Sequence, residues 1–396
     1  MSNLIESLLK YLFKYLGIFH QEYPVLAVLF DVCFIVLVGW FLYREGVDGK
    51  PYFKFFNKKD SSGWKSPKFR NQTKNPPSPP PEPPKDPKFR NQTKKPPSPP
   101  PEPPKELDRR WIFLAMAISV AGPILFIGIT GKTLPETPTP TARAVYKEIE
   151  ALSPGTPVLI SFDFDPASGG ELTPMATSLV HQCAARGLRM VFIALWPLGP
   201  QLIDETIKRV ILADYPNLKE GVDYVNLGFQ SGNESVMKVM LTDFAKAFPI
   251  TKNGVAVGDV VALKGIQRVD NFPLLITISA GYPGAKEWIQ YVISSSGGKI
   301  KMVTGCTGVQ TPGLYPYYPV QLNGLLGAIK GAAEYESLVN SSLAPKDSSA
   351  AVPAKYLEAQ RRMGPQLGAH LLMIALIILG NIAFFAQRNS KVRATS

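Results

Sequence analysis

The stretch PVLISFDFD at residues 157–165 decides the fold of this chain. Its apolar residues run almost unbroken up to two aspartates, which is typical of a strand buried on both faces of a sheet. A helical pattern follows over 173–186, where Thr173 and Pro174 suit the N-cap and the first position of a helix. A buried strand followed by a helix is the repeating unit of a parallel sheet.

The same alternation continues along the chain. Apolar runs predict four further strands at 189–195, 222–229, 273–280 and 299–307. Helical patterns follow them at about 200–214, 232–247, 284–296 and 320–340, and residues 249–272 interrupt the rhythm as a loop or hairpin. We therefore predict an α/β fold class: a Rossmann-like three-layer domain with a mostly parallel sheet of about five strands, within residues 131–364.

Small, polar or aromatic residues follow the predicted strands. The carboxyl ends of parallel strands meet at one edge, where the ligands of open α/β sheets bind. We therefore predict a ligand site centred on Asp163. The candidate ligand-binding residues are Asp163, Asp165, Trp196, Asn226, Ser279, Thr304, Cys306, Tyr315 and Tyr317. The alternative is that the glycines and prolines beside them serve only the strand-to-helix turns.

Asp163 and Asp165 are also the candidate catalytic residues. The text FDFD after an apolar strand resembles the opening of the haloacid-dehalogenase-like phosphatases, in which the first aspartate is the nucleophile and the second is the acid. The resemblance implies a later Ser or Thr, which Thr277 or Ser279 could supply. It also implies an acidic pair after the last core strand, but residues 304–308 contain no acidic residue. The family has a Thr or Val two residues after the second aspartate, where this chain has Ala167. The DxD pattern is similar to the metal-binding element of nucleotide-sugar glycosyltransferases. A purely structural role, capping the turn that follows, is the alternative.

Other motifs of cofactor and metal chemistry are missing from the sequence. It has no GxGxxG after the first strand and no phosphate-binding GKS or GKT loop. Its three cysteines and three histidines form neither a disulfide framework nor a zinc pattern. The cofactor therefore stays unknown, no metal site is predicted, and no nucleic-acid partner is indicated.

Three apolar segments lie at 24–43, 111–130 and 367–386, and about 20 helical residues cross a ~30 Å hydrocarbon core. We predict three transmembrane helices. Residues 44–110 carry 17 basic and 8 acidic residues, and the tail 387–396 adds three basic residues and no acid. The positive-inside rule then places this loop and the tail in the cytoplasm, and the N-terminus and residues 131–364 outside. The third span is ambiguous under this rule, because Lys355, Arg361 and Arg362 lie at its outer end.

The remaining segments predict contacts with the membrane surface. Residues 1–23 are expected to form an amphipathic interfacial helix, or to pack on the domain or a partner. The loop 44–110 contains a tandem 20-residue repeat, 67–86 and 87–106, whose proline tracts favour polyproline II. We interpret this loop as a spacer that contacts anionic inner-leaflet lipids; docking of its PxxPxK motifs is the alternative. Asp31, within the first span, is either a neutral or hydrogen-bonded group or an ion site.

The sequence favours a non-catalytic function. We predict a multi-pass protein of the cell membrane that presents an extracytoplasmic α/β domain for ligand binding, sensing or scaffolding among protein partners in a membrane complex. The incomplete catalytic and cofactor motifs favour this interpretation. The alternative is a membrane-anchored, metal-dependent hydrolase or transferase that uses Asp163 and Asp165.

Overall fold

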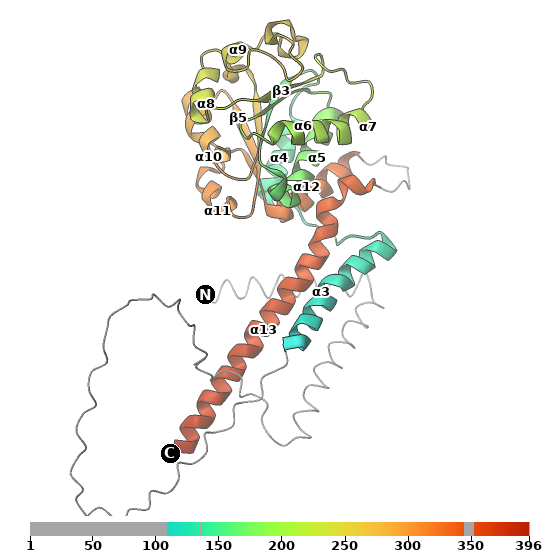
Figure 1. Cartoon of the computed structure of the whole chain (residues 1–396), viewed down its shortest axis with the longest axis vertical. Coiled ribbons are helices and arrows are strands. Elements are labelled where there is room, and N and C mark those ends of the chain that lie inside the picture. Colours follow the sequence, from blue (N-terminus) through green and yellow to red (C-terminus); the bar gives the residue numbers. More distant parts are fainter. Residues whose placement is uncertain (1–108, 135, 344–351, 396) are drawn as a thin grey trace, which may run out of the picture. The chain divides into compact units, whose positions relative to one another are not determined.

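The computed structural model describes residues 109–134, 136–343 and 352–395 (Figure 1). The predictions for 1–23, 24–43, Asp31 and the repeats within 44–108 lie outside these residues. The chain divides into two compact units, and one of them, Leu114–Met373, holds the entire sheet. In the other unit, the structure describes only the first residues of α3 (Arg109–Thr130) and the last part of α13 (Glu358–Thr395).

A six-stranded, all-parallel sheet confirms the Rossmann-like α/β prediction. The strand order is β3-β2-β1-β4-β5-β6, with β1 and β4 paired at its centre. The five predicted strands are all present. The strands are β1 (Pro157–Asp163), β2 (Arg189–Ala194), β3 (Tyr224–Phe229), β4 (Leu274–Ser279), β5 (Lys301–Cys306) and β6 (Gly324–Gly327).

The sixth strand corrects the prediction of one continuous helix over 320–340. Residues Gly324–Gly327 pair with β5, and α12 (Ala328–Leu343) begins only after them. Four residues with two glycines are too short to show a strand pattern in the sequence. The first glycine is needed because a Cβ on Gly324 would lie 2.6 Å from the backbone nitrogen of Val145 in α4 (Pro140–Glu150).

Helices cover both faces of the sheet, so the domain has three layers (Figure 1). One buried cluster joins one face to α4, α5 (Gly169–Ala185), α6 (Gly199–Thr206) and α12. The other joins the opposite face to α8 (Glu234–Met240), α9 (Phe244–Ala247) and the π-helical η7 (Trp288–Ile293), which continues α10 (Ala285–Glu287). Each strand is therefore buried on both sides, which explains the unbroken apolar runs.

Two helix predictions were wrong in their details. The helix after β1 begins at Gly169 rather than beside Thr173, because Asp165 caps a short 3-10 turn, η2 (Pro166–Ser168), that leads into it. Pro174 therefore lies inside α5, where it cannot bond the carbonyl of Gly170; Arg362 donates to that carbonyl instead. The helix predicted over 232–247 is divided into α8 and α9. Residues 249–272, predicted as a loop or hairpin, hold an antiparallel bridge between Ile250 and Ala256 and three 3-10 turns.

Two helices are long and apolar enough to span a membrane. Their candidate spans are Ile112–Thr130 in α3 and Glu358–Asn381 in α13. The first agrees with the predicted span 111–130. The second begins earlier than the predicted 367–386, because the helix already starts at Glu358 with a polar turn before its apolar stretch.

Two buried carboxylates of α12 hold the segments that adjoin these helices. Glu336 accepts hydrogen bonds from the backbone nitrogens of Ala359 (2.9 Å) and Gln360 (3.0 Å), in the first turn of α13. Glu334 accepts from the hydroxyl (2.6 Å) and the backbone nitrogen (3.0 Å) of Thr139, the N-cap of α4. Burial raises the pKa of Glu336 to about 8 despite its two backbone donors. Each carboxylate satisfies backbone donors that a helix start leaves without partners.

Helices α3 and α13 approach closely at two glycines. A Cβ on Gly368 would lie 2.3 Å from the carbonyl oxygen of Ser119, and a Cβ on Gly364 would lie 3.3 Å from the Ile127 side chain. Glycines four residues apart are the spacing that lets membrane helices pack backbone against backbone. The contact at Gly368 meets backbone rather than a flexible side chain, so it cannot be relieved by a rotamer change.

We predict that Gly368→Val separates α3 from α13 and lowers the free energy of unfolding by about 2 kcal/mol, because the added carbons meet the backbone of Ser119. The measurement is thermal unfolding of the full chain in detergent. Gly122→Val in α3 is the matched control, since a Cβ there has no neighbour within 4 Å. Equal losses from the two variants would contradict the close packing.

Candidate functional site

The predicted site lies at the carboxyl edge of the sheet. The chain leaves β1 toward β2 and β3 on one side and returns through β4, β5 and β6 on the other. The ends of β1 and β4 therefore form the switch point at which ligands of such sheets usually bind. Asp163 and Ser279 end these two strands and are paired in register.

Asp163 is completely buried and has three protein hydrogen-bond donors. Its Oδ1 accepts from the backbone nitrogen of Leu195 (2.9 Å), which follows β2. Its Oδ2 accepts from the hydroxyl of Ser161 (2.7 Å) and from the indole nitrogen of Trp288 in η7 (2.9 Å). The carboxylate therefore ties β1 to a neighbouring strand end and to a covering helix, which is a structural role.

Burial raises the pKa of Asp163 from 3.8 to about 6, although its three donors favour the ionised form. The folded state therefore binds this proton more tightly than the unfolded state. Protonation of Asp163 therefore adds to the stability of the folded state. This contribution is fully present below pH 3.8 and is lost as the pH rises through about 6. Asp163 is ionised at neutral pH, with its donors around it.

Trp196 covers the switch point from the β2 side. Its indole nitrogen donates to the carbonyl of Pro283 (2.8 Å), in the loop after β4. Its ring lies against Gly281, where a Cβ would be 3.1 Å from it. The loops after β2 and β4 thus meet across the end of β1, in the place where a nucleotide would lie on an open sheet.

The polar residues of the central and distal strands are paired with one another. The Ser279 hydroxyl donates to Gln310 (2.9 Å) and accepts from the backbone nitrogen of Ala285. The hydroxyl of Thr304 is 2.7 Å from that of Thr277. Cys306 is 3.4 Å from the hydroxyl of Thr311, and burial raises its thiol pKa to about 11. A thiol with so high a pKa is a poor nucleophile.

The other predicted residues lie apart from this centre. Asp165 is half-buried and accepts from the backbone nitrogen of Ser168, so it has the capping role that was the alternative interpretation. Asn226, in the middle of β3, donates a hydrogen bond from its side-chain amide to Asp204 (2.8 Å). Tyr315 is 55% exposed and Tyr317 accepts from Gln290 (3.2 Å), both in the 3-10 turn η9 (Tyr315–Tyr317). Ligand binding by these residues stays a prediction.

Sequence reasoning did not identify the apolar side chains exposed along the same edge. They are Leu198, Phe229, Tyr282 and Val309, with exposed fractions of 48%, 37%, 57% and 93%. Phe229 ends β3, and the other three follow the ends of β2, β4 and β5. A single apolar residue in a loop gives no signal in the sequence; only the parallel topology brings these four to one edge.

No protein-family model matches this sequence, and no curated protein is significantly similar to it. Its function is therefore inferred from the geometry of its own residues.

We predict that Asp163→Asn lowers the free energy of unfolding by about 2 kcal/mol at pH 7. An amide cannot accept at both of its polar atoms, so one buried donor loses its acceptor, at a cost of about 1–3 kcal/mol. Chemical denaturation of the full chain measures the loss. Asp165→Asn is the control: asparagine caps as well as aspartate, so its loss should stay below about 0.5 kcal/mol. An Asp163→Asn variant as stable as the wild type would show that Asp163 is not a structural carboxylate.

Proposed function

We propose that this chain is a multi-pass protein of the cell membrane whose α/β domain is extracytoplasmic and non-catalytic. It acts as a binding or scaffolding module in a membrane complex, and the carboxyl edge of its sheet docks a protein partner. In this orientation the N-terminus is also outside, and the basic loop 44–110 and the tail are cytoplasmic, with the loop on anionic inner-leaflet lipids.

The surfaces of the two long helices support a membrane location. Phe113, Leu125 and Ile129 of α3 are 70%, 63% and 84% exposed, and Ile377 of α13 is 62% exposed. Large apolar side chains exposed along a whole helix are unfavourable in water and favourable in hydrocarbon. The excess of basic residues in 44–110 then supports the proposed orientation.

One observation carries the docking proposal: the polar groups of the carboxyl edge are paired with one another, while large apolar side chains are exposed there. Asp163, Ser279 and Thr304 each have protein partners, as described above. A small-molecule site needs convergent polar groups that are free to bind. An edge with satisfied polar groups and exposed aromatic and aliphatic residues is typical of a protein interface.

The dimensions of the edge fit such an interface. The four exposed residues lie at or just after the ends of β3, β2, β4 and β5. In the order of the sheet, β3 and β5 are four strand spacings apart. At about 4.8 Å per spacing, they extend over roughly 19 Å. A patch of this length fits within a standard interface of about 800 Å² per partner.

The enzymatic alternative has less support from the geometry. The Asp163 carboxylate is surrounded by protein donors, and Asp165 caps a turn. Within the described part of the chain, no three His, Cys, Asp or Glu residues form a group that could hold a metal ion. A metal-dependent transfer through this pair would first have to break bonds that the fold uses.

We predict that Val309→Glu abolishes binding of the protein partner to the full-length protein without changing its unfolding temperature, because a charge buried in an apolar interface is costly to desolvate. The measurement is chemical cross-linking in membranes, followed by mass spectrometry of the cross-linked species. Val320→Glu is the matched control, since Val320 is 88% exposed but lies in the turn that leads back to the start of β6. Cross-linked species that persist in Val309→Glu, or that both variants lose, would contradict docking at this edge.

A further inference from the structure

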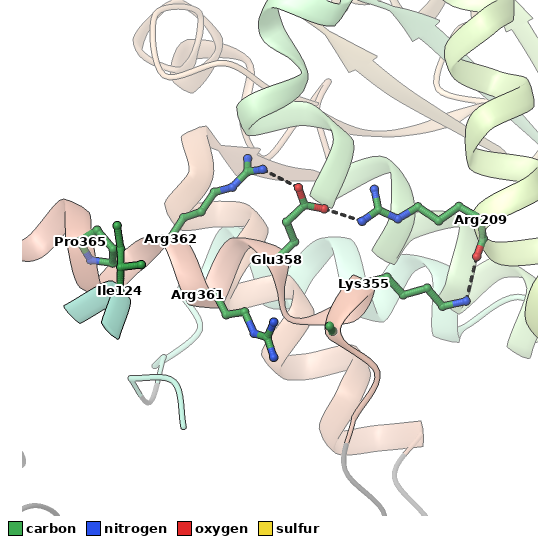
Figure 2. A pocket seen from close by; sticks show the side chains of 8 residues that line it. Ile124, Arg209, Lys355, Glu358, Arg361, Arg362 and Pro365 are labelled. Atoms are coloured by element: carbon green, nitrogen blue, oxygen red, sulfur yellow. Dashed lines mark hydrogen bonds and ion pairs between the residues drawn. The ribbon is translucent and has the colours of Figure 1, made fainter. Parts of the chain in front are cut away.

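A basic cavity of about 490 Å³ lies beside the start of α13, within the unit Leu114–Met373 (Figure 2). Its lining combines positive and apolar side chains with one carboxylate. The lining residues are Ile124, Arg209, Ala354, Lys355, Glu358, Arg361, Arg362 and Pro365. The lining carries four cations and one carboxylate, and Asp214 pairs with one of these cations, so the cavity has a net positive charge and favours an anion.

Three of the four cations already have partners. Arg209 and Arg362 both bind Glu358, which lies between them in Figure 2. Lys355 binds Asp214 (2.7 Å) and the backbone carbonyl of Arg209 (2.8 Å).

Arg361 differs from these three. Among the described residues, its guanidinium has no hydrogen bond or ion pair, and its buried Nε has no acceptor. A guanidinium is always charged and presents donors that match the oxygens of a phosphate. An orphaned Arg361 in a positive cavity therefore points to a phosphate ligand.

A second cavity, apolar except for Arg361, adjoins the basic one. It measures about 290 Å³ and is lined by Ile124, Ile127, Gly128, Gly131 and Arg361. Ile124 and Arg361 line both cavities, so the positive site continues directly along α3. A soluble anion needs only the basic part, whereas a lipid needs an apolar path next to the charge.

We propose that the two cavities together bind one anionic phospholipid, with Arg361 contacting the phosphate and the α3 side holding the beginning of an acyl chain. The proposal rests on the membrane location proposed above. It also explains why Lys355, Arg361 and Arg362 lie at the outer end of a span, where they oppose the positive-inside pattern. In this proposal they bind the lipid headgroup and do not set the orientation of the helix.

The test measures thermal unfolding of the full chain in a neutral detergent, titrated separately with dioctanoyl phosphatidylglycerol, dioctanoyl phosphatidylcholine and inorganic phosphate. We expect phosphatidylglycerol to raise the unfolding temperature and the other two to have no effect at the same concentrations. In Arg361→Gln, the phosphatidylglycerol concentration for half the effect should rise about tenfold, the loss of one charge-assisted contact. Lys286→Gln, which removes an exposed cation elsewhere, should behave as the wild type. Arg361→Lys keeps the charge without the guanidinium fork and should be intermediate.

Three results would overturn the proposal. Equal shifts with inorganic phosphate would make the ligand a soluble anion, and equal shifts with phosphatidylcholine would remove the role of charge. An unchanged titration in both Arg361 variants would place the lipid elsewhere. Extraction of the chain from membranes by carbonate, with phosphatidylglycerol binding retained, would defeat the proposed membrane location but not this site.

Discussion

The hydrogen bonds that two helix starts donate to the buried carboxyl groups of α12 are the constraint on which the rest of the structure depends. Glu336 holds the first turn of α13, and Glu334 holds the start of α4, which follows α3 in the chain. Both glutamates are about 1% exposed, so their bonds are shielded from water. The first turn of α13 in turn positions Glu358 and Arg361 at the basic cavity. Further contacts join the start of α13 to the domain, among them the ion pair of Arg209 with Glu358 and the hydrogen bond from Arg362 to the carbonyl of Gly170.

The same use of buried polar groups explains why a Rossmann-like sheet need not bind a nucleotide. In this chain, Asp163 and Trp196 use their polar atoms to join the loops and helices around the switch point. A shared fold does not imply a shared ligand, because the site depends on the particular residues that the fold carries. We propose that binding uses instead the exposed apolar side chains at the sheet edge and the cavity beside α13.

The sequence was sufficient for elements whose pattern is local and long. The apolar runs predicted β1 to β5, and the uniform apolar segment predicted α3, because burial on both sides or contact with lipid removes polar residues. It failed for β6, whose four residues are defined by pairing with β5, and for the start of α5, which depends on the Asp165 cap. The sequence predicted that polar residues follow the strands. It did not predict their hydrogen-bond partners, because these can lie far along the chain, as Trp288 does from Asp163.

The central claim is that α3 and α13 cross a membrane and that the α/β domain lies outside the cell. Its most direct measurement is labelling by a membrane-impermeant maleimide of intact cells that express Ser295→Cys or Ser78→Cys, with Cys33, Cys183 and Cys306 replaced. Ser295 is exposed on the domain, and Ser78 belongs to the basic loop. We expect Ser295→Cys to react in intact cells and Ser78→Cys to react only after lysis. Labelling of Ser78→Cys in intact cells, with Ser295→Cys protected, would contradict the claim.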